Sequence, residues 1–195
     1  MHSLIRRKLK KYILIIVFQL ITLILWIYAK YERGEEYAFG NIPIYLSQIF
    51  ALWGLIFFSI NYFIATRMQS IEYFFGGLDK VYKFHRFIGE SAFVMILAHP
   101  ILLAIDSLPH LIIVKTLFIP FIPSGSFAKS MGIISLYIYA ILILITIFRF
   151  LPYNIWKLTH KLMGIPFFFA AIHGLMAESD VKHVFILRYW ILFWI

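Results

Sequence analysis

Four histidines in this 195-residue chain lie within or beside long apolar segments, and their spacing suggests a shared chemistry. They are His85, His99, His160 and His173. A single histidine in such a segment often only hydrogen bonds to a neighbouring helix. Here the two spacings, fourteen and thirteen residues, each correspond to about 20 Å along a helix. Two imidazole pairs at two depths of a membrane can each supply both axial ligands of a haem iron.

The two histidines predicted on one helix share a face of that helix in one case and not in the other. At about 100° per residue, fourteen residues leave a residual rotation of about 40°, so His85 and His99 share a helix face. Thirteen residues leave about 140°, so His160 and His173 do not share a face on an ideal helix. Pro166 lies between them and can kink or rewind the helix, which is one way to restore the alignment.

The remaining histidines and the absence of cysteine narrow the possible metal chemistry. His2 lies in a basic N-terminal segment, and His110 and His183 lie in or beside connections, so we interpret them as polar interface residues. The chain has no cysteine, which excludes disulfides, iron–sulfur clusters, cysteine-type zinc sites and covalently attached c-type haem.

The elements that carry these histidines are predicted to be membrane-spanning helices. Hydrophobic residues make up 63% of the chain and charged residues 14%, against about 25% charged in a soluble domain. This composition excludes a water-soluble fold and predicts an all-α integral membrane protein. Because about 20 helical residues cross a bilayer, we expect six spans, the last of them short. They cover residues 12–29, 44–66, 85–105, 131–148, 162–177 and 181–195.

The excess of basic residues is interpreted as a membrane-topology signal. The chain has 18 Lys and Arg against 9 Asp and Glu, an imbalance that in a soluble protein would suggest nucleic acid as a partner. Most of these residues lie before the first apolar segment or in the connections, twelve on one predicted side and five on the other. The positive-inside rule then places both termini in the cytoplasm. We therefore expect the chain to lie in the lipid bilayer of the cell membrane, and we do not expect it to bind nucleic acid.

Two connections have features of their own. The segment 106–130 contains an apolar stretch, residues 111–122, which is too short to span and is expected to lie in the interface or dip over the bundle. Gly76 and Gly77 are expected to form a turn, and no glycine-rich phosphate-binding loop is present.

Several short motifs contain or precede the four histidines. They are His85-Arg86-Phe87-Ile88-Gly89, His99-Pro100, Trp156-Lys157-Leu158-Thr159-His160 and Ala171-Ile172-His173-Gly174. Together they resemble the ferric reductase and NADPH oxidase transmembrane domain, over essentially the whole chain, residues 1–195. The resemblance implies a six-helix bundle that binds two b-type haems between spans three and five. It also implies that His85 and His160 ligate the inner haem, and that His99 and His173 ligate the outer haem.

The activity implied by the resemblance is transmembrane electron transfer by a haem-containing oxidoreductase. In that family NAD(P)H reduces FAD in a cytoplasmic module after the sixth span, and the electrons reach oxygen, giving superoxide, or ferric iron outside. No flavin module follows before Ile195, so we expect a truncated transmembrane portion. The alternative is a stand-alone haem subunit that receives electrons from a separate flavin reductase and passes them to a periplasmic or extracellular enzyme. Animal NADPH oxidases carry a further histidine where this chain has Leu103.

Charged residues near the histidines are candidate partners of the haem propionates. Burying a charge in lipid costs a few kcal/mol, so Glu90 and Arg188, within spans three and six, are expected to face the bundle. Arg188 either binds a propionate or forms an ion pair with Glu90. Arg86 and Lys161 adjoin the inner ligands and either bind propionates or act as positive-inside anchors.

A membrane transporter or a structural scaffold is the alternative from another functional class. A small transporter is expected to show paired halves with interrupted spans, and no such symmetry is found in the sequence. A scaffold leaves the four depth-matched histidines unexplained. Bound haem would distinguish these possibilities, because a haem protein is red and a transporter or scaffold is colourless.

Overall fold

The computed structural model describes residues 2–35, 39–108, 118–121, 126–148, 151–177 and 179–195, and every regular element in these ranges is helical. The short 3₁₀ helix η1 precedes α2. The elements in chain order are α1 (His2–Glu32), η1 (Phe39–Asn41), α2 (Ile42–Ala65), α3 (Gln69–Phe75), α4 (Leu78–Asp106), α6 (Phe127–Phe148), α7 (Tyr153–Lys161), α8 (Gly164–Met176), α9 (Asp180–His183) and α10 (Phe185–Trp194).

Four helices in the described ranges are long and apolar enough to cross a membrane. They are α1 from Lys11 to Glu32, together with α2, α4 and α6. The predicted all-helical membrane fold is therefore confirmed. The fifth and sixth predicted spans form shorter helices, α8 with 13 residues and α10 with 10, below the roughly 20 residues of a full crossing. The number of six spans stays a prediction.

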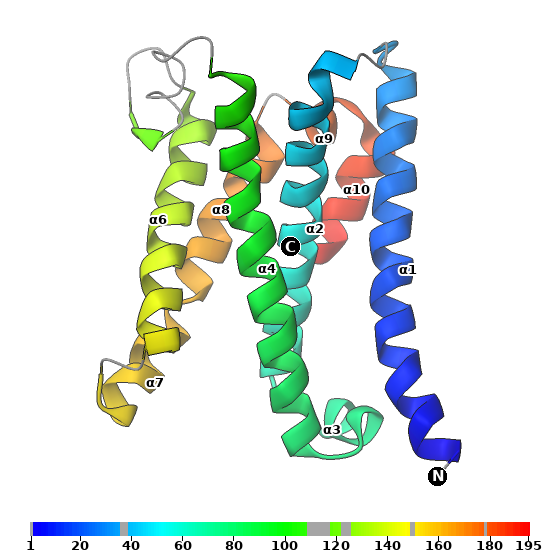
Figure 1. Ribbon diagram of the computed structural model, residues 1–195, viewed down its shortest axis with the longest axis vertical. Coiled ribbons are helices and arrows are strands. Elements are labelled where there is room, and N and C mark those ends of the chain that lie inside the picture. The colour runs from blue at the N-terminus through cyan, green and yellow to red at the C-terminus, as the bar shows by residue number, and fades with distance from the viewer. Residues whose placement is uncertain (1, 36–38, 109–117, 122–125, 149–150, 178) are drawn as a thin grey trace.

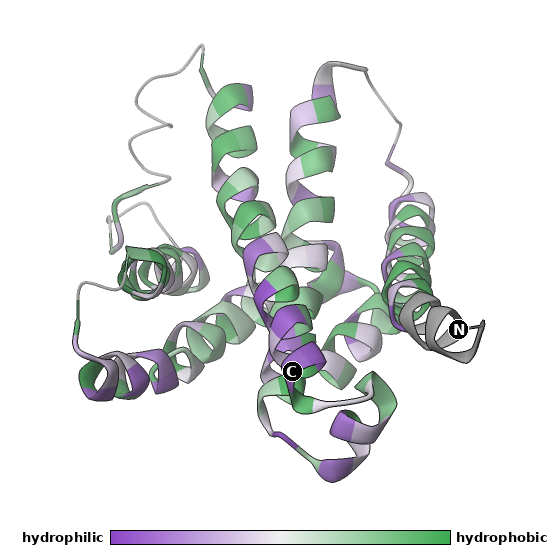
Figure 2. Cartoon of the chain, turned by 60° about the horizontal axis from the view of Figure 1, so that its bottom comes forward, coloured by the Kyte–Doolittle hydropathy of each residue, from purple (hydrophilic) through white to green (hydrophobic). Residues whose placement is uncertain are grey.

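The long helices alternate in direction, which places the connections at two ends of the bundle (Figure 1). The start of α1, the short helix α3 and the helix α7 lie at one end, and α9 lies at the opposite end with the start of α2. Hydrophilic residues gather at the first end, on α3, α7 and the start of α4 (Figure 2). The basic connections expected on one side of the membrane thus lie at the same end of the bundle.

Two apolar clusters form the core, and α2 contributes to both. The cluster nearer α3 includes Phe57, Phe58 and Ile88, and the cluster nearer α9 includes Ile56 and Leu187. Other large apolar residues point outward on the long helices, where lipid would cover them. Because α2 belongs to both clusters, it fixes the positions of its neighbours along their length.

A buried ion-pair cluster joins the end of α1 to α9, and it was not anticipated from the sequence. Lys30 Nζ lies 3.0 Å from Asp180 Oδ2 and 2.6 Å from Glu35 Oε2, and Arg33 Nη1 lies 2.8 Å from Asp180 Oδ1. Lys30 and Asp180 are only 2% and 3% exposed. Sequence reasoning treated Lys30 and Arg33 as ordinary charges of a connection, because Asp180 is about 150 residues away along the chain.

Removing one charge from this cluster should destabilise the protein strongly. Lys30→Met leaves the Asp180 carboxylate buried beside one fewer cation, and breaking a buried ion pair in this way costs about 3–5 kcal/mol. The free energy of unfolding in detergent measures the loss. Arg86→Gln is the matched control, since the Arg86–Glu90 pair is 80% and 58% exposed and should contribute about 0–1 kcal/mol. Equal losses in both variants would contradict the structural role of the cluster.

Candidate functional site

The four histidines predicted from the sequence meet in two pairs. His85 on α4 faces His160 at the end of α7, with ring centres 6.1 Å apart and ring planes at 73°. His99 on α4 faces His173 on α8, with ring centres 6.3 Å apart and ring planes at 54°. We call these the inner pair and the outer pair, following the predicted topology.

A break in the helix explains how His160 and His173 can both face α4, although thirteen residues of an ideal helix would turn them to different faces. The expected fifth span is not one helix, because α7 ends at Lys161 and α8 begins at Gly164. Pro166 has no N–H to donate to the carbonyl of Leu162, and that carbonyl accepts from Ile165 N at 2.9 Å instead. The break therefore turns both histidines toward α4, as the presence of Pro166 suggested it could.

Hydrogen bonds fix the ring orientation of the outer pair. His173 Nδ1 lies 2.8 Å from the carbonyl oxygen of Ala128, which can only accept, so Nδ1 carries the proton. His99 Nδ1 lies 2.8 Å from Ser47 Oγ and 3.1 Å from the Ser47 carbonyl oxygen. The Ser47 hydroxyl donates to the His99 carbonyl at 2.9 Å, which leaves Oγ to accept from Nδ1. In both rings Nε2 then holds a lone pair that is able to bind a metal ion.

The two histidine rings of the inner pair differ in their hydrogen bonds. His160 Nδ1 lies 3.3 Å from Thr146 Oγ1, whose hydroxyl donates to the Leu142 carbonyl at 2.8 Å, so Thr146 accepts from the histidine. Trp156 stacks on the His160 ring with centres 5.3 Å apart. The Nδ1 atom of His85 is buried and has no hydrogen-bond partner among the described residues.

Two helices that carry none of the four histidines support the three helices, α4, α7 and α8, that do. α2 packs along α4 and supplies Ser47, and α6 packs along α8 and supplies Ala128 and Thr146. Sequence reasoning missed these supporting residues. Ser47 and Thr146 are visible as hydroxyl residues within apolar spans, but matching them to a histidine requires the register between helices.

Gly132 on α6 allows α6 and α8 to approach each other closely at His173. A Cβ atom at position 132 would lie 2.8 Å from both Cγ and Nδ1 of His173, too close for the ring to stay in place. Glycine is therefore required here by space rather than by backbone conformation.

Gly132→Ala should displace the His173 ring and weaken metal or haem binding at the outer pair while sparing the inner pair. Haem titration of the purified protein, followed by absorbance, measures both sites. Gly174→Ala is the control, because its Cβ would meet only Leu55 Cδ2 at an ordinary 3.7 Å. Unchanged outer binding in Gly132→Ala would show that the ring can shift without consequence.

The geometry of both pairs fits two imidazoles on opposite sides of one metal ion. With metal–nitrogen bonds of about 2.0–2.1 Å, such ligands place their ring centres about 6.3 Å apart. The observed separations are 6.1 and 6.3 Å. Within the described ranges no cluster of three or more His, Cys, Asp or Glu side chains could hold a metal ion. Two protein ligands per site suit a metal whose remaining ligands come from a macrocycle such as haem.

Comparison with known families identifies the family of the chain. A family model for the ferric reductase like transmembrane component matches residues 50–172, which contain three of the four histidines and end directly before His173. The chain belongs to this family. No curated protein matches the chain. Membership of the ferric reductase-like family identifies the chain as a membrane component of oxidoreductase type and supports transmembrane electron transfer as its class of activity.

The other candidate residues of this ferric reductase-like chain lie apart from the histidine contacts. Arg86 Nε pairs with Glu90 Oε1 at 2.8 Å on an exposed face of α4. Lys161 is exposed at the end of α7, and Arg188 Nη1 donates to the Lys182 carbonyl at 3.5 Å. Of the two alternatives given for Arg188, the ion pair with Glu90 is wrong, because Glu90 pairs instead with Arg86, one helical turn before it. The expectation that Glu90 faces the bundle is wrong as well, because its side chain is 58% exposed.

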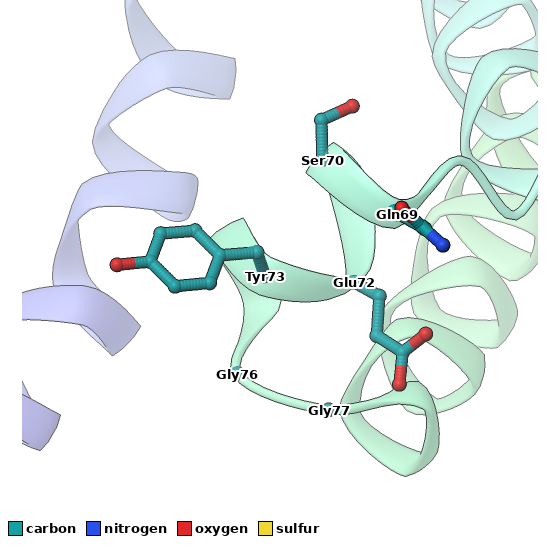
Figure 3. Close-up of a pocket in the computed structure, with 6 residues that line it drawn as sticks. All are labelled: Gln69, Ser70, Glu72, Tyr73, Gly76 and Gly77. Carbon is teal, nitrogen blue, oxygen red and sulfur yellow. The ribbon is translucent and has the colours of Figure 1, made fainter.

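A shallow depression beside α3 is separate from the histidine pairs (Figure 3). It is lined by Gln69, Ser70, Glu72, Tyr73, Gly76 and Gly77. The expected turn at Gly76 and Gly77 is confirmed, since both have positive φ angles, 76° and 128°. The expected interfacial stretch 111–122 and His110 lie largely outside the described residues.

Proposed function

We propose that this chain transfers electrons across the membrane by means of two b-type haems, one held by His85 and His160 and one by His99 and His173. A haem with two histidine ligands supplies one-electron transfer and leaves no open iron position for a substrate. The observation that carries the proposal is the separation of the rings within each pair, which matches two imidazoles sharing one iron.

The residues around the histidines support this assignment. Ala128, Thr146 and Ser47 each engage an Nδ1 atom and so present Nε2 as the ligand nitrogen, a pattern common around metal-binding histidines. The two pairs share α4 and are separated by fourteen residues, or about 20 Å along the helix. This spacing divides the bilayer into two shorter distances for an electron.

We infer that electrons enter at the inner pair and leave at the outer pair. His85 and His160 lie on α4 and α7 toward the end that carries α3 and the start of α1 (Figure 1). The excess of basic residues in the connections at this end favours the cytoplasm. A cytoplasmic module or partner that binds FAD and NAD(P)H would donate the electrons, and oxygen or a ferric complex would accept them outside.

The role of the basic candidates follows from their positions. Lys161 adjoins His160 and is free to turn toward a propionate from the end of α7. Arg86 would have to break its ion pair with Glu90 to reach a propionate, and this exposed ion pair is weak. Arg188 lies on α10, which packs against α1, α2 and α9. We therefore favour Lys161 among the three as the propionate partner.

The spectrum of the purified protein tests the proposal against the transporter and scaffold alternatives. We expect a red protein whose Soret band shifts when dithionite is added. A colourless protein that stays colourless after incubation with excess haemin would rule out the proposal.

A further inference from the structure

The register that brings Ser47 of α2 to His99 of α4 has a second position at the inner pair. α2 and α4 run antiparallel, so moving fourteen residues forward from Ser47 corresponds to moving fourteen residues back from His99. These steps lead to Asn61 and His85. Fourteen residues leave a rotation of only about 40°, so Asn61 lies on nearly the same face of α2 as Ser47.

Close contacts along the two helices support this register. A Cβ at Gly89 would lie 2.9 Å from Asn61 Nδ2, and a Cβ at Gly54 would lie 2.9 Å from Ile96 Cγ1. Gly89 is one helical turn beyond His85, so the Asn61 side chain reaches α4 on the face that carries the inner ligand. Glycine at position 89 leaves the space that the amide occupies.

Two complementary polar atoms lie unpartnered in this region. The donor is His85 Nδ1 and the acceptor is Asn61 Oδ1, and both are buried without a hydrogen bond among the described residues. The Asn61 backbone also lies on the side of His85, so the whole residue is placed against the inner ligand. Buried donors and acceptors are normally paired, and a hydrogen bond between these two atoms would satisfy both of them.

We propose that Asn61 positions the inner ligand by accepting a hydrogen bond from His85 Nδ1–H through its side-chain Oδ1. Asn61 would thus serve His85 as Ser47 serves His99, and α2 would orient both histidines of α4. The inference rests on the proposed function. An acceptor at Nδ1 makes the imidazole a more basic ligand, which strengthens haem binding and lowers the reduction potential of the bound iron.

Haem titration and redox titration of the inner site test this role. Both are performed in the His99→Leu background, where only the inner pair can bind haem. Asn61→Leu should weaken haem binding by about 10–100-fold and raise the midpoint potential. Asn61→Asp keeps an acceptor oxygen and should keep tight binding, with a potential equal to or below that of Asn61. Ser47→Ala, introduced instead into a His85→Leu background, should weaken the outer site by a smaller factor, because the Ser47 carbonyl, 3.1 Å from His99 Nδ1, still accepts its hydrogen bond.

The outcomes separate this inference from the proposed function. If the chain without substitutions binds no haem, the proposed function fails, and the role of Asn61 fails with it. If it binds two haems but Asn61→Leu changes neither inner affinity nor potential, only the role of Asn61 is overturned. If Asn61→Leu does not fold, the Asn61→Asp variant provides the test. A midpoint potential of its inner haem above that of the protein with Asn61 overturns the inference.

Discussion

Replacing His99 with leucine should abolish electron delivery to a ferric complex outside the membrane while the inner site can still be reduced from the α3 and α7 end. The substitution removes one of the two outer ligands, and leucine has no metal-binding atom. An electron at the inner pair would then have to cross most of the bilayer in one step instead of two steps of about 20 Å or less. Replacing His173 should have the same effect.

Stopped-flow spectroscopy on proteoliposomes measures both parts of this prediction. A membrane-impermeant reductant is confined to the face bearing α3 and α7, and reduction of haem and of a ferric complex on the far side are followed separately. His183→Leu is the matched control, because His183 lies on α9 and belongs to neither pair. Undiminished delivery in His99→Leu would show that the outer pair is not on the electron path.

Replacing His85 with leucine should block electron entry altogether. The inner pair is the first site reached from the α3 and α7 end, and without it the outer pair lies too far from the donor. Neither haem reduction from that face nor delivery to the far side should occur, although the outer site still binds haem. If His99→Leu lost this reduction while His85→Leu kept it, the assigned order of the sites and the topology behind it would both be wrong.

Features local in the sequence were predicted well. The apolar segments located α1, α2, α4 and α6, although α4 begins at Leu78, seven residues before the expected start. Those seven residues include Lys80 and Lys83, which a hydropathy pattern excludes but a helix accommodates. Pro166 correctly marked the region where the helix carrying His160 and His173 is interrupted.

Features that depend on register between distant helices were not predicted. Ser47 supports His99 and Thr146 supports His160, but a hydroxyl residue in an apolar helix often bonds only to a carbonyl of its own helix, as Thr146 also does to Leu142. Lys30 and Asp180 are paired across 150 residues, and nothing in either local sequence indicates the partner. The sequence leaves the partner of Glu90 open, with distant Arg188 as one alternative, whereas in the structure Arg86, four residues away, pairs with it.

The haem content of the purified chain tests the central claim most directly. After reconstitution with excess haemin and removal of unbound haem, the pyridine haemochrome assay should give two b-type haems per chain. The His85→Leu and His99→Leu variants should each give one, and the double variant none. Fewer than one haem per chain in the protein without substitutions would contradict the assignment of the two histidine pairs as haem ligands.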